Sequence, residues 1–281
     1  MADACVNRLD TLLHRFPVRA RMFHAGAVCG IADFSTPGSG GQLHLLRAGA
    51  MDVVHSGRLA ALHVSVPSLL FYPRPLPRRF MTEPGCEADL VCAELLFDGG
   101  AEHPIAAALP DVVCLPLADI AAMEHVLTML FDEAFGDHCG REAVVDRLFE
   151  VVLVRLLRHL LEDGQIRGGM LAGLTHPKLR KALTAMHEQP GRAWTLEALA
   201  DSAGMSRSVF AGVFRDIVGC TPGAYLQGWR VRLTQQGLGR GRSLKRIAEE
   251  VGYGSEAALS RAFKAQCGMT PRQWRQDRDA S

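Results

Sequence analysis

The side chains with the clearest chemical use lie in two stretches near the end of the chain, at residues 207–215 and 245–264. The candidates are Arg207, Ser208, Ala211, Gly212 and Arg215 in the first stretch, and Lys245, Arg246, Ser255, Glu256, Ser260, Arg261 and Lys264 in the second. Arginine donates to both acceptors on the major-groove edge of guanine, while arginine, lysine and serine bind phosphate oxygens. This mixture of cationic and small polar residues is chemically suited to phosphate groups and base edges.

These candidates belong to a segment that occurs twice, because residues 195–229 recur as residues 243–278. At an offset of 48, the matches are Leu196 with Leu244, Leu199 with Ile247, Ala200 with Ala248 and Gly204 with Gly252. At an offset of 49, they continue with Phe210 and Leu259, Phe214 and Phe263, Gly219 and Gly268, Thr221 and Thr270, and Pro222 and Pro271. Each copy opens with a hydroxyl residue suited to an N-cap and contains a glycine suited to a tight turn. The repeat predicts two helix-turn-helix units.

A linker helix is expected between the units. Thr221 and Pro222 form an N-cap followed by proline at the first helical position, and an apolar stripe follows. Gly237, Gly239 and Gly241 then alternate where a firm helix avoids glycine. Either the helix stops early or the two units are loosely coupled, and the sequence leaves both open.

At these residues the chain resembles the AraC/XylS family of bacterial transcription regulators, over roughly residues 177–275 and with a G-x-T-P ending in each unit. The resemblance implies that the second helix of each unit lies in the major groove. Arg261 matches a position where the family usually carries arginine, whereas the first unit has Gly212 there and departs from the family pattern. Arg207 or Arg215 is left to contact phosphate or base. A helical repeat used only for packing or oligomerisation is the alternative.

The charge is divided between the two halves of the chain. Residues 176–281 contain 17 Lys and Arg against 9 Asp and Glu, a net +8, and the rest of the chain contains 14 against 21, a net −7. A basic half suits a phosphate backbone. Lys245 and Arg246 lie in the first turn of an expected helix, where cations are disfavoured unless a phosphate lies nearby, so they are either phosphate ligands or solvated side chains.

The N-terminal half predicts short strands from about residue 29 to 115, in apolar runs separated by glycine and proline. Helical patterns follow at 119–135 and 141–162. The order of segments, and residues 98–113 above all, resembles the cupin-like domain of one AraC branch. We therefore expect an α+β chain with a cupin-like sensor and dimerisation domain at 1–170 and an AraC-type DNA-binding domain at 171–281, the boundary falling within 164–175.

The helix expected at 141–162 is apolar nearly all round. It packs onto its own barrel or forms the seam of a homodimer, and different faces can do both. We favour a homodimer.

The cupin resemblance raises the alternative of a metalloenzyme or a small-ligand-binding protein. His44, His55 and His63 lie on expected strands, but the His-x-His spacing of metal-binding cupins is absent. We expect no metal, no cofactor and no enzymatic activity. Arg74, Arg78 and Arg79 either line a pocket for an anionic ligand or form a solvated basic loop.

Eight cysteines lack the C-x-x-C spacing of metal sites. Cys29, expected just before the first long strand, and Cys92 resemble positions that carry cysteine in the reactive-chlorine-sensing regulators of this branch. The resemblance makes them candidate redox sites, and buried packing is the alternative.

The expected function is that of a sequence-specific, DNA-binding transcription regulator whose N-terminal domain senses an oxidant or a small molecule. Its expected partners are promoter DNA, a second copy of the chain and RNA polymerase. The N-terminus lacks the apolar run of a signal peptide and no run is long enough to span a bilayer, so a cytoplasmic protein is expected.

Overall fold

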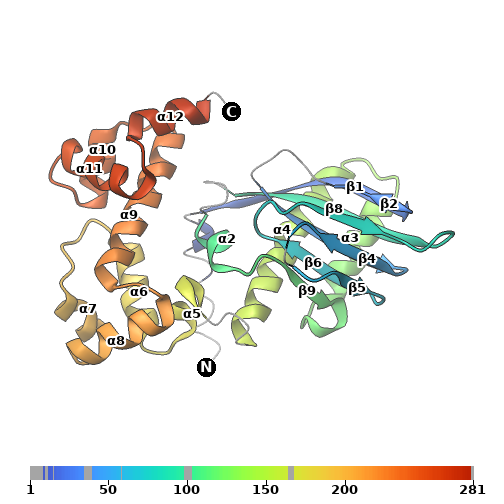
Figure 1. Ribbon diagram of the computed structural model, residues 1–281, viewed down its shortest axis with the longest axis horizontal. Coiled ribbons are helices and arrows are strands. Elements are labelled where there is room, and N and C mark those ends of the chain that lie inside the picture. Colours follow the sequence, from blue (N-terminus) through green and yellow to red (C-terminus); the bar gives the residue numbers. More distant parts are fainter. Residues whose placement is uncertain are drawn as a thin grey trace. The chain divides into compact units, whose positions relative to one another are not determined.

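Figure 1 shows the computed structural model of the chain, which describes residues 9, 12–14, 16–34, 40–57, 59–97, 103–163 and 168–279. The chain divides into two compact units, Met1–Gln165 and Ile166–Ser281. The first unit is rich in strands and carries helices, and the second is entirely helical in its described part. The expected α+β class is confirmed.

The described strands of the first unit form two antiparallel sheets. One sheet contains, in spatial order, β1 (Val18–Cys29), β8 (Glu87–Phe97), β3 (Gly41–Ala48), β6 (Ser68–Tyr72) and β9 (Val113–Pro116). The other contains β2 (Ile31–Ala32), β7 (Arg78–Met81), β4 (Met51–His55) and β5 (Leu62–Val64). The inner faces enclose an apolar core that includes Val53, Leu70, Tyr72, Phe80 and Leu90.

The strand region begins earlier than the sequence predicts. β1 starts at Val18 and Cys29 is its last residue, so the expectation that Cys29 precedes the first long strand is wrong. Few residues of β1 are buried, and Ala20 and Val28 are the only fully buried ones among them. β1 therefore lacks the clean apolar alternation by which a half-buried strand is recognised. Residues 98–102, which begin the stretch most similar to cupins, lie outside the described residues.

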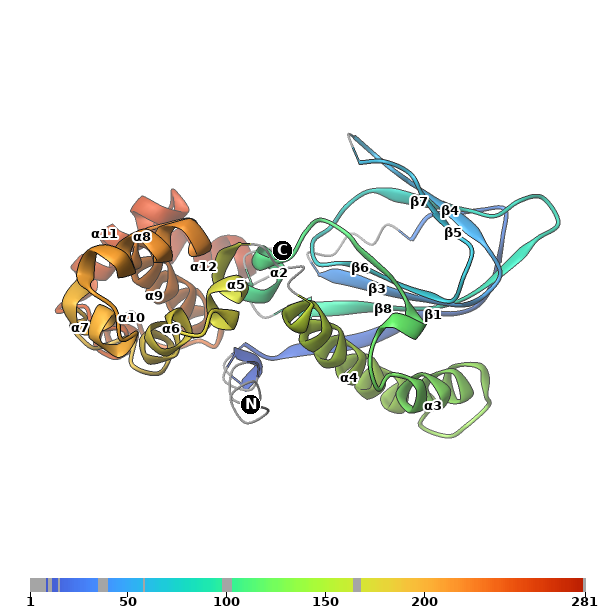
Figure 2. The ribbon, with the colours of Figure 1, turned by 90° about the horizontal axis from the view of Figure 1, so that it is seen from below.

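Two helices cover the side of the five-stranded sheet that faces away from the four-stranded one (Figure 2). α4 (Arg141–Glu162) matches the expected range, whereas α3 (Glu124–Phe135) starts later than expected because a short 3-10 turn, η2 (Leu117–Asp119), comes first. Another short helix, α2 (Pro104–Ala108), precedes β9. The buried residues of α4 are Val145, Phe149, Val152, Leu153, Leu156, Leu157, Leu160 and Leu161.

α4 also covers part of one edge of the sheet. β1 is an edge strand, and two of its backbone amides donate to carboxylates of α4: Ala20 N to Glu150 Oε1 at 3.4 Å and Met22 N to Asp146 Oδ1 at 2.6 Å. The packing of the helix onto its own barrel is thus observed. Val144 and Val151 remain exposed on the other side of α4.

The second unit contains α5 (Gly169–Thr175), α6 (Leu179–Glu188), α7 (Leu196–Ser202), α8 (Arg207–Val218), α9 (Pro222–Gly239), α10 (Leu244–Val251), α11 (Glu256–Cys267) and α12 (Pro271–Asp279). The predicted caps are confirmed. The Thr195 hydroxyl accepts from Ala198 N at 3.1 Å, and the Ser243 hydroxyl accepts from Arg246 N at 3.4 Å. α7 with α8 and α10 with α11 form the two helix-turn-helix units, and α9 joins them.

The glycines at the end of α9 serve close packing. The helix runs through Gly237 and ends at Gly239, so it does not stop before them. A Cβ on Gly237 would lie 2.8 Å from the Ile247 side chain of α10, and a Cβ on Gly239 would overlap the Arg278 guanidinium of α12. Because the Arg278 guanidinium can move aside, the Gly237 contact is the one that lets α10 pack closely on the linker helix, a role that the sequence analysis did not consider.

A second close approach joins the two helix-turn-helix units. Gly252 ends α10 at a φ of 80°, and a Cβ there would lie 2.8 Å from Gly191 Cα, in the loop between α6 and α7. Glycine at both positions lets backbone meet backbone. None of the described helices is both long enough and apolar enough to cross a membrane.

We predict that Gly252→Ala lowers the free energy of unfolding of the C-terminal unit more than Gly268→Ala does. Both glycines end a helix at positive φ, 80° and 73°, so alanine costs roughly 1 to 2 kcal/mol at each. Only Gly252 also abuts backbone, since an added Cβ on Gly268 meets no atom within 4 Å. Urea unfolding followed by the helical signal measures both losses, and equal losses would contradict the close contact with Gly191.

Candidate nucleic-acid interface

α8 and α11 present the predicted readout residues on their outer faces. Phe210 and Phe214 of α8, and Leu259 and Phe263 of α11, are fully buried and fix which face points inward. The exposed candidates on and beside these helices are Arg207, Ser208, Gly212, Arg215, Ser255, Glu256, Arg261 and Lys264, with Ala211 and Ser260 half-buried. The structure therefore places the candidates of each unit on or beside one helix, except Lys245 and Arg246, which lie exposed on α10.

Most of the candidate cations are free for an outside partner. Among the described residues, no hydrogen bond or ion pair is made by the side chains of Arg207, Arg215, Lys245, Arg261 or Lys264. Arg246 differs, because its Nε lies 3.2 Å from Glu250 Oε1 of the same helix. The Arg246 side chain is 72% exposed, so this pair adds little stability and yields readily to a phosphate.

Two candidates have roles in the helix itself. The Ser255 hydroxyl accepts from Ala258 N at 3.2 Å and caps α11, which leaves its O–H to donate elsewhere. Glu256 lies in the first turn, where a carboxylate stabilises the positive end of the helix. Gly212 sits on the exposed face of α8 with open space around it, since an added Cβ would meet no atom within 4 Å.

A buried aromatic cluster that the sequence analysis missed joins α6 to the linker helix α9. His187 of α6 stacks on Trp229 of α9 with ring centroids 3.9 Å apart, and its Nε2 lies 2.7 Å from the Tyr225 hydroxyl. Burial raises the pKa of Tyr225, so the hydroxyl stays neutral and hydrogen-bonded. The amphipathic pattern of α6 was the available signal, because it placed His187 on the same face as Leu179 and Leu183.

Arg230 of α9 ties both units to the linker helix. Its Nε donates to Pro190 O at 2.7 Å and its terminal nitrogen donates to Arg192 O at 2.9 Å, both in the loop before α7. Its guanidinium also lies over the ring of Tyr253, 5.6 Å from the centroid, in the turn of the second unit. Burial lowers the pKa of Arg230, yet three partners from two units hold it. Nothing local in the sequence distinguishes this arginine from its neighbours.

The histidines of the first unit do not assemble a metal site. His44 and His55 are buried on β3 and β4, while His63 is exposed on β5 and lies 2.8 Å from Asp52 Oδ1. Across the described residues, no group of three or more His, Cys, Asp or Glu side chains is arranged to hold a metal ion.

The three arginines considered as a basic loop have separate surroundings. Arg74 donates to Leu109 O at 3.0 Å and pairs with Asp111 at 2.7 Å. Arg79 is exposed, whereas Arg78 is only 5% exposed. The interpretation as a solvated loop is therefore wrong for Arg78, which points into the barrel from β7.

The candidate redox cysteines lie far apart. Cys92 is opposite His24 in the β1–β8 register, five residues along β1 from Cys29, which corresponds to about 16 Å. A disulfide needs Cα atoms within about 7 Å. Burial also raises the pKa of the Cys92 thiol, which keeps it protonated and unreactive. Cys29 is exposed and lies opposite Glu87 in the β1–β8 register. The residue before Glu87 is Cys86, which is also exposed.

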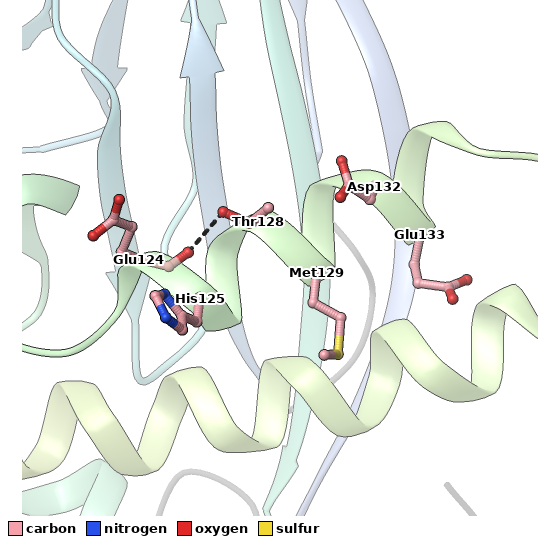
Figure 3. A pocket seen from close by; sticks show the side chains of 6 residues that line it. All are labelled: Glu124, His125, Thr128, Met129, Asp132 and Glu133. Carbon is pink, nitrogen blue, oxygen red and sulfur yellow. Dashed lines mark hydrogen bonds between the residues drawn. The ribbon is translucent and has the colours of Figure 1, made fainter.

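A groove of about 520 Å³ runs along the exposed face of α3 (Figure 3). Its lining comes from one helix and includes three carboxylates, Glu124, Asp132 and Glu133. The Thr128 hydroxyl donates to the Glu124 carbonyl at 3.0 Å, so it is turned back onto the helix. Negative charge repels phosphate, so this face of α3 is not a candidate DNA-binding surface.

Two family models match the chain. A cupin model matches residues 7–162, more than half of the chain, and a helix-turn-helix domain model matches residues 199–277. The first range contains the two sheets with their covering helices, and the second covers the two helix-turn-helix units and α9, except the start of α7.

Curated relatives give the same result. The chain is 38% identical to an AraC-like transcription regulator of Streptomyces lividans over 68% of this chain and 64% of that protein. It is 41% identical to the transcriptional regulator AlkR of Acinetobacter baylyi over 49% and 45% of the two chains. Less than two thirds of either relative is thus spanned. It is also 27% identical to the transcriptional activator RclR of Escherichia coli over 87% and 89%.

These relatives are transcription regulators rather than enzymes. With a cupin domain matched over more than half of its length and a helix-turn-helix domain after it, the chain belongs to the AraC family of transcriptional regulators that carry an N-terminal cupin domain.

Proposed function

We propose that the chain is a cytoplasmic, sequence-specific DNA-binding transcription regulator. α8 and α11 enter adjacent major grooves of promoter DNA, and the cupin domain senses a signal that changes this binding. The observation that carries the proposal is the pair of exposed helices, each with unpaired cations, held on one buried linker helix. Two recognition helices on one face of a duplex need centres about 34 Å apart, and a firm linker helix suits that requirement.

The two units are expected to contribute unequally. Arg261 on α11 reads a guanine, and Lys264 and Lys245 hold phosphates. Gly212 takes the corresponding position on α8 and offers no side chain. The first helix-turn-helix unit therefore reads its half-site through Ser208 with Arg207 or Arg215. Ser255, Glu256, Ala211 and Ser260 then shape the surface beside these contacts, and Arg246 exchanges its pairing with Glu250 for a phosphate.

The N-terminal unit is proposed to supply sensing and dimerisation. We assign the two domains to residues 1–170 and 171–281. Val144 and Val151 on the outer face of α4 are apolar and exposed, which supports a homodimer seam there. RNA polymerase is a further proposed partner at the promoter. A metalloenzyme is not favoured, because His44, His55 and His63 are each hydrogen-bonded to a different side chain.

We propose oxidation at Cys29 as one input. Hypochlorous acid takes two electrons from the Cys29 thiol to give a sulfenic acid and chloride, and condensation with the Cys86 thiol releases water and leaves a disulfide. The support is the exposure of both thiols and the position of Cys86 beside the residue opposite Cys29. Cys92 takes no part in this scheme, because it is buried.

We predict that Arg261→Ala weakens binding to the preferred site by about 1 to 3 kcal/mol and relaxes the preference at one base position. Selection from random duplexes, followed by titration of the best and a scrambled sequence, measures both effects. Lys264→Ala is the matched control on the same helix, with equal losses on both sequences and a shallower salt dependence. The same pattern for Arg261→Ala would assign Arg261 to the backbone instead.

We predict that Gly212→Ala raises the free energy of unfolding by up to about 1 kcal/mol, because alanine favours a helix and the site has room. Base preference should stay unchanged in Gly212→Ala and gain one specified position in Gly212→Arg. Urea unfolding and binding-site selection give these results. A loss of DNA affinity in Gly212→Ala would show instead that the α8 backbone itself approaches the duplex.

We predict that hypochlorite alters the DNase footprint of the wild-type protein and that a thiol reductant restores it. Cys29→Ser should abolish the response, Cys86→Ser should prevent the disulfide, and Cys92→Ser should respond like wild type. Mass spectrometry after alkylation identifies the bridge. A response that disappears only in Cys92→Ser would refute the assignment to the exposed thiols.

A further inference from the structure

The N-terminal unit contains a cavity that takes no part in the proposed DNA contacts or in the oxidation of Cys29. Its volume is about 400 Å³, within the range of about 300 to 1,000 Å³ typical of small-molecule sites. β4 supplies His55 to the wall, β7 supplies Arg78 and Arg79, and Ser56 lies just after β4. Asp33 completes the charged lining. We call this space the Arg78 cavity.

Arg78 is the unusual member of the lining because its charge is buried without an anionic partner. Its terminal nitrogens donate to the carbonyl of Leu76 at 2.9 Å, to the side-chain carbonyl of Gln42 and to His44 Nε2 at 2.7 Å. Its Nε is buried and makes no hydrogen bond. Within the described part of the chain, no carboxylate lies within ion-pair distance of its guanidinium, and Asp33 attracts it only from farther away.

The neighbours of Arg78 are neutral and mostly aromatic. Its guanidinium lies over the Tyr72 ring, 3.7 Å from the centroid, and the Tyr72 hydroxyl lies 2.9 Å from His55 Nε2. Burial and the nearby Arg78 charge lower the pKa of His44, so His44 accepts from Arg78 as a neutral ring. Burial lowers the pKa of Arg78 to about 10, which still leaves it charged at neutral pH.

A buried cation without a counterion is costly unless something outside the chain pairs with it. Two guanidinium groups and one carboxylate give the cavity wall one excess positive charge. That balance selects a monoanion over a dianion such as phosphate. The volume is also far larger than an inorganic ion needs, and Val54 and Pro77 add apolar surface for an organic body.

We propose that the Arg78 cavity binds a small organic monoanion whose carboxylate pairs with Arg78, while Arg79 adds positive charge at the rim. This inference rests on the proposed sensor role of the cupin domain, and it names the chemical class of a ligand that this domain takes. The bound carboxylate supplies the missing countercharge, and His55 and Ser56 lie at the wall to position the rest of the molecule.

The test is calorimetric titration of the full-length protein with benzoate, its neutral analogue benzamide and inorganic phosphate. We expect benzoate to bind at least about tenfold more tightly than either of the others. Arg78→Met, which keeps the length of the side chain without the charge, should weaken benzoate binding at least about tenfold. Arg74→Met is the matched control, because Arg74 lies outside the cavity and pairs with Asp111.

Ser56→Trp provides a second variant that leaves the buried network in place. Ser56 is exposed on the cavity wall, so tryptophan there should block the cavity and abolish benzoate binding without unfolding the protein, as checked by thermal denaturation. Equal affinity for benzoate and benzamide, tighter binding of phosphate, or unchanged binding in Ser56→Trp would each overturn the proposal. Footprinting of the wild-type protein without benzoate tests the proposed DNA-binding function separately. A protein that leaves no footprint would refute that function, whereas the calorimetric results alone decide whether the cavity binds an anion.

Discussion

The C-terminal unit, Ile166–Ser281, depends on a single constraint. Its linker helix α9 must be buried by two separate helix-turn-helix units at once. Trp229 is fully buried in its core, and His187 stacks on it from α6. Arg230, one residue later, donates to two carbonyls before α7 and lies over Tyr253 of the second unit. Adjacent positions on α9 therefore hold both units, and the spacing between the recognition helices follows from this one helix.

The glycines of this unit serve the same constraint in a different way. Gly237 lets α10 approach α9, and Gly191 with Gly252 lets the two helix-turn-helix units meet through backbone atoms. An apparently weak helix end is thus a close-packed one. If these contacts fix the spacing of the recognition helices, the DNA must match that spacing, either directly or by bending.

Local features of the fold were predictable from the sequence, and long-range ones were not. The caps at Thr195 and Ser243 and the ends of α4 follow from residue type and period within a few positions. The start of β1 was missed because an edge strand with few buried residues carries little apolar alternation. Arg230 and Arg78 were not distinguishable from solvated arginines, since their partners lie on segments distant in the sequence. The separation of Cys29 and Cys92 likewise depends on strand register, which the sequence alone does not determine.

The carboxylates of α4 on the free edge of β1 have a consequence for assembly. An exposed edge strand is a template for adding a strand from another chain, and such addition underlies both peptide capture and aggregation. With Glu150 and Asp146 occupying the amides of Ala20 and Met22, this stretch of the edge is not open to an incoming strand. A partner that docks beside Ala20 and Met22 must therefore do so through side chains.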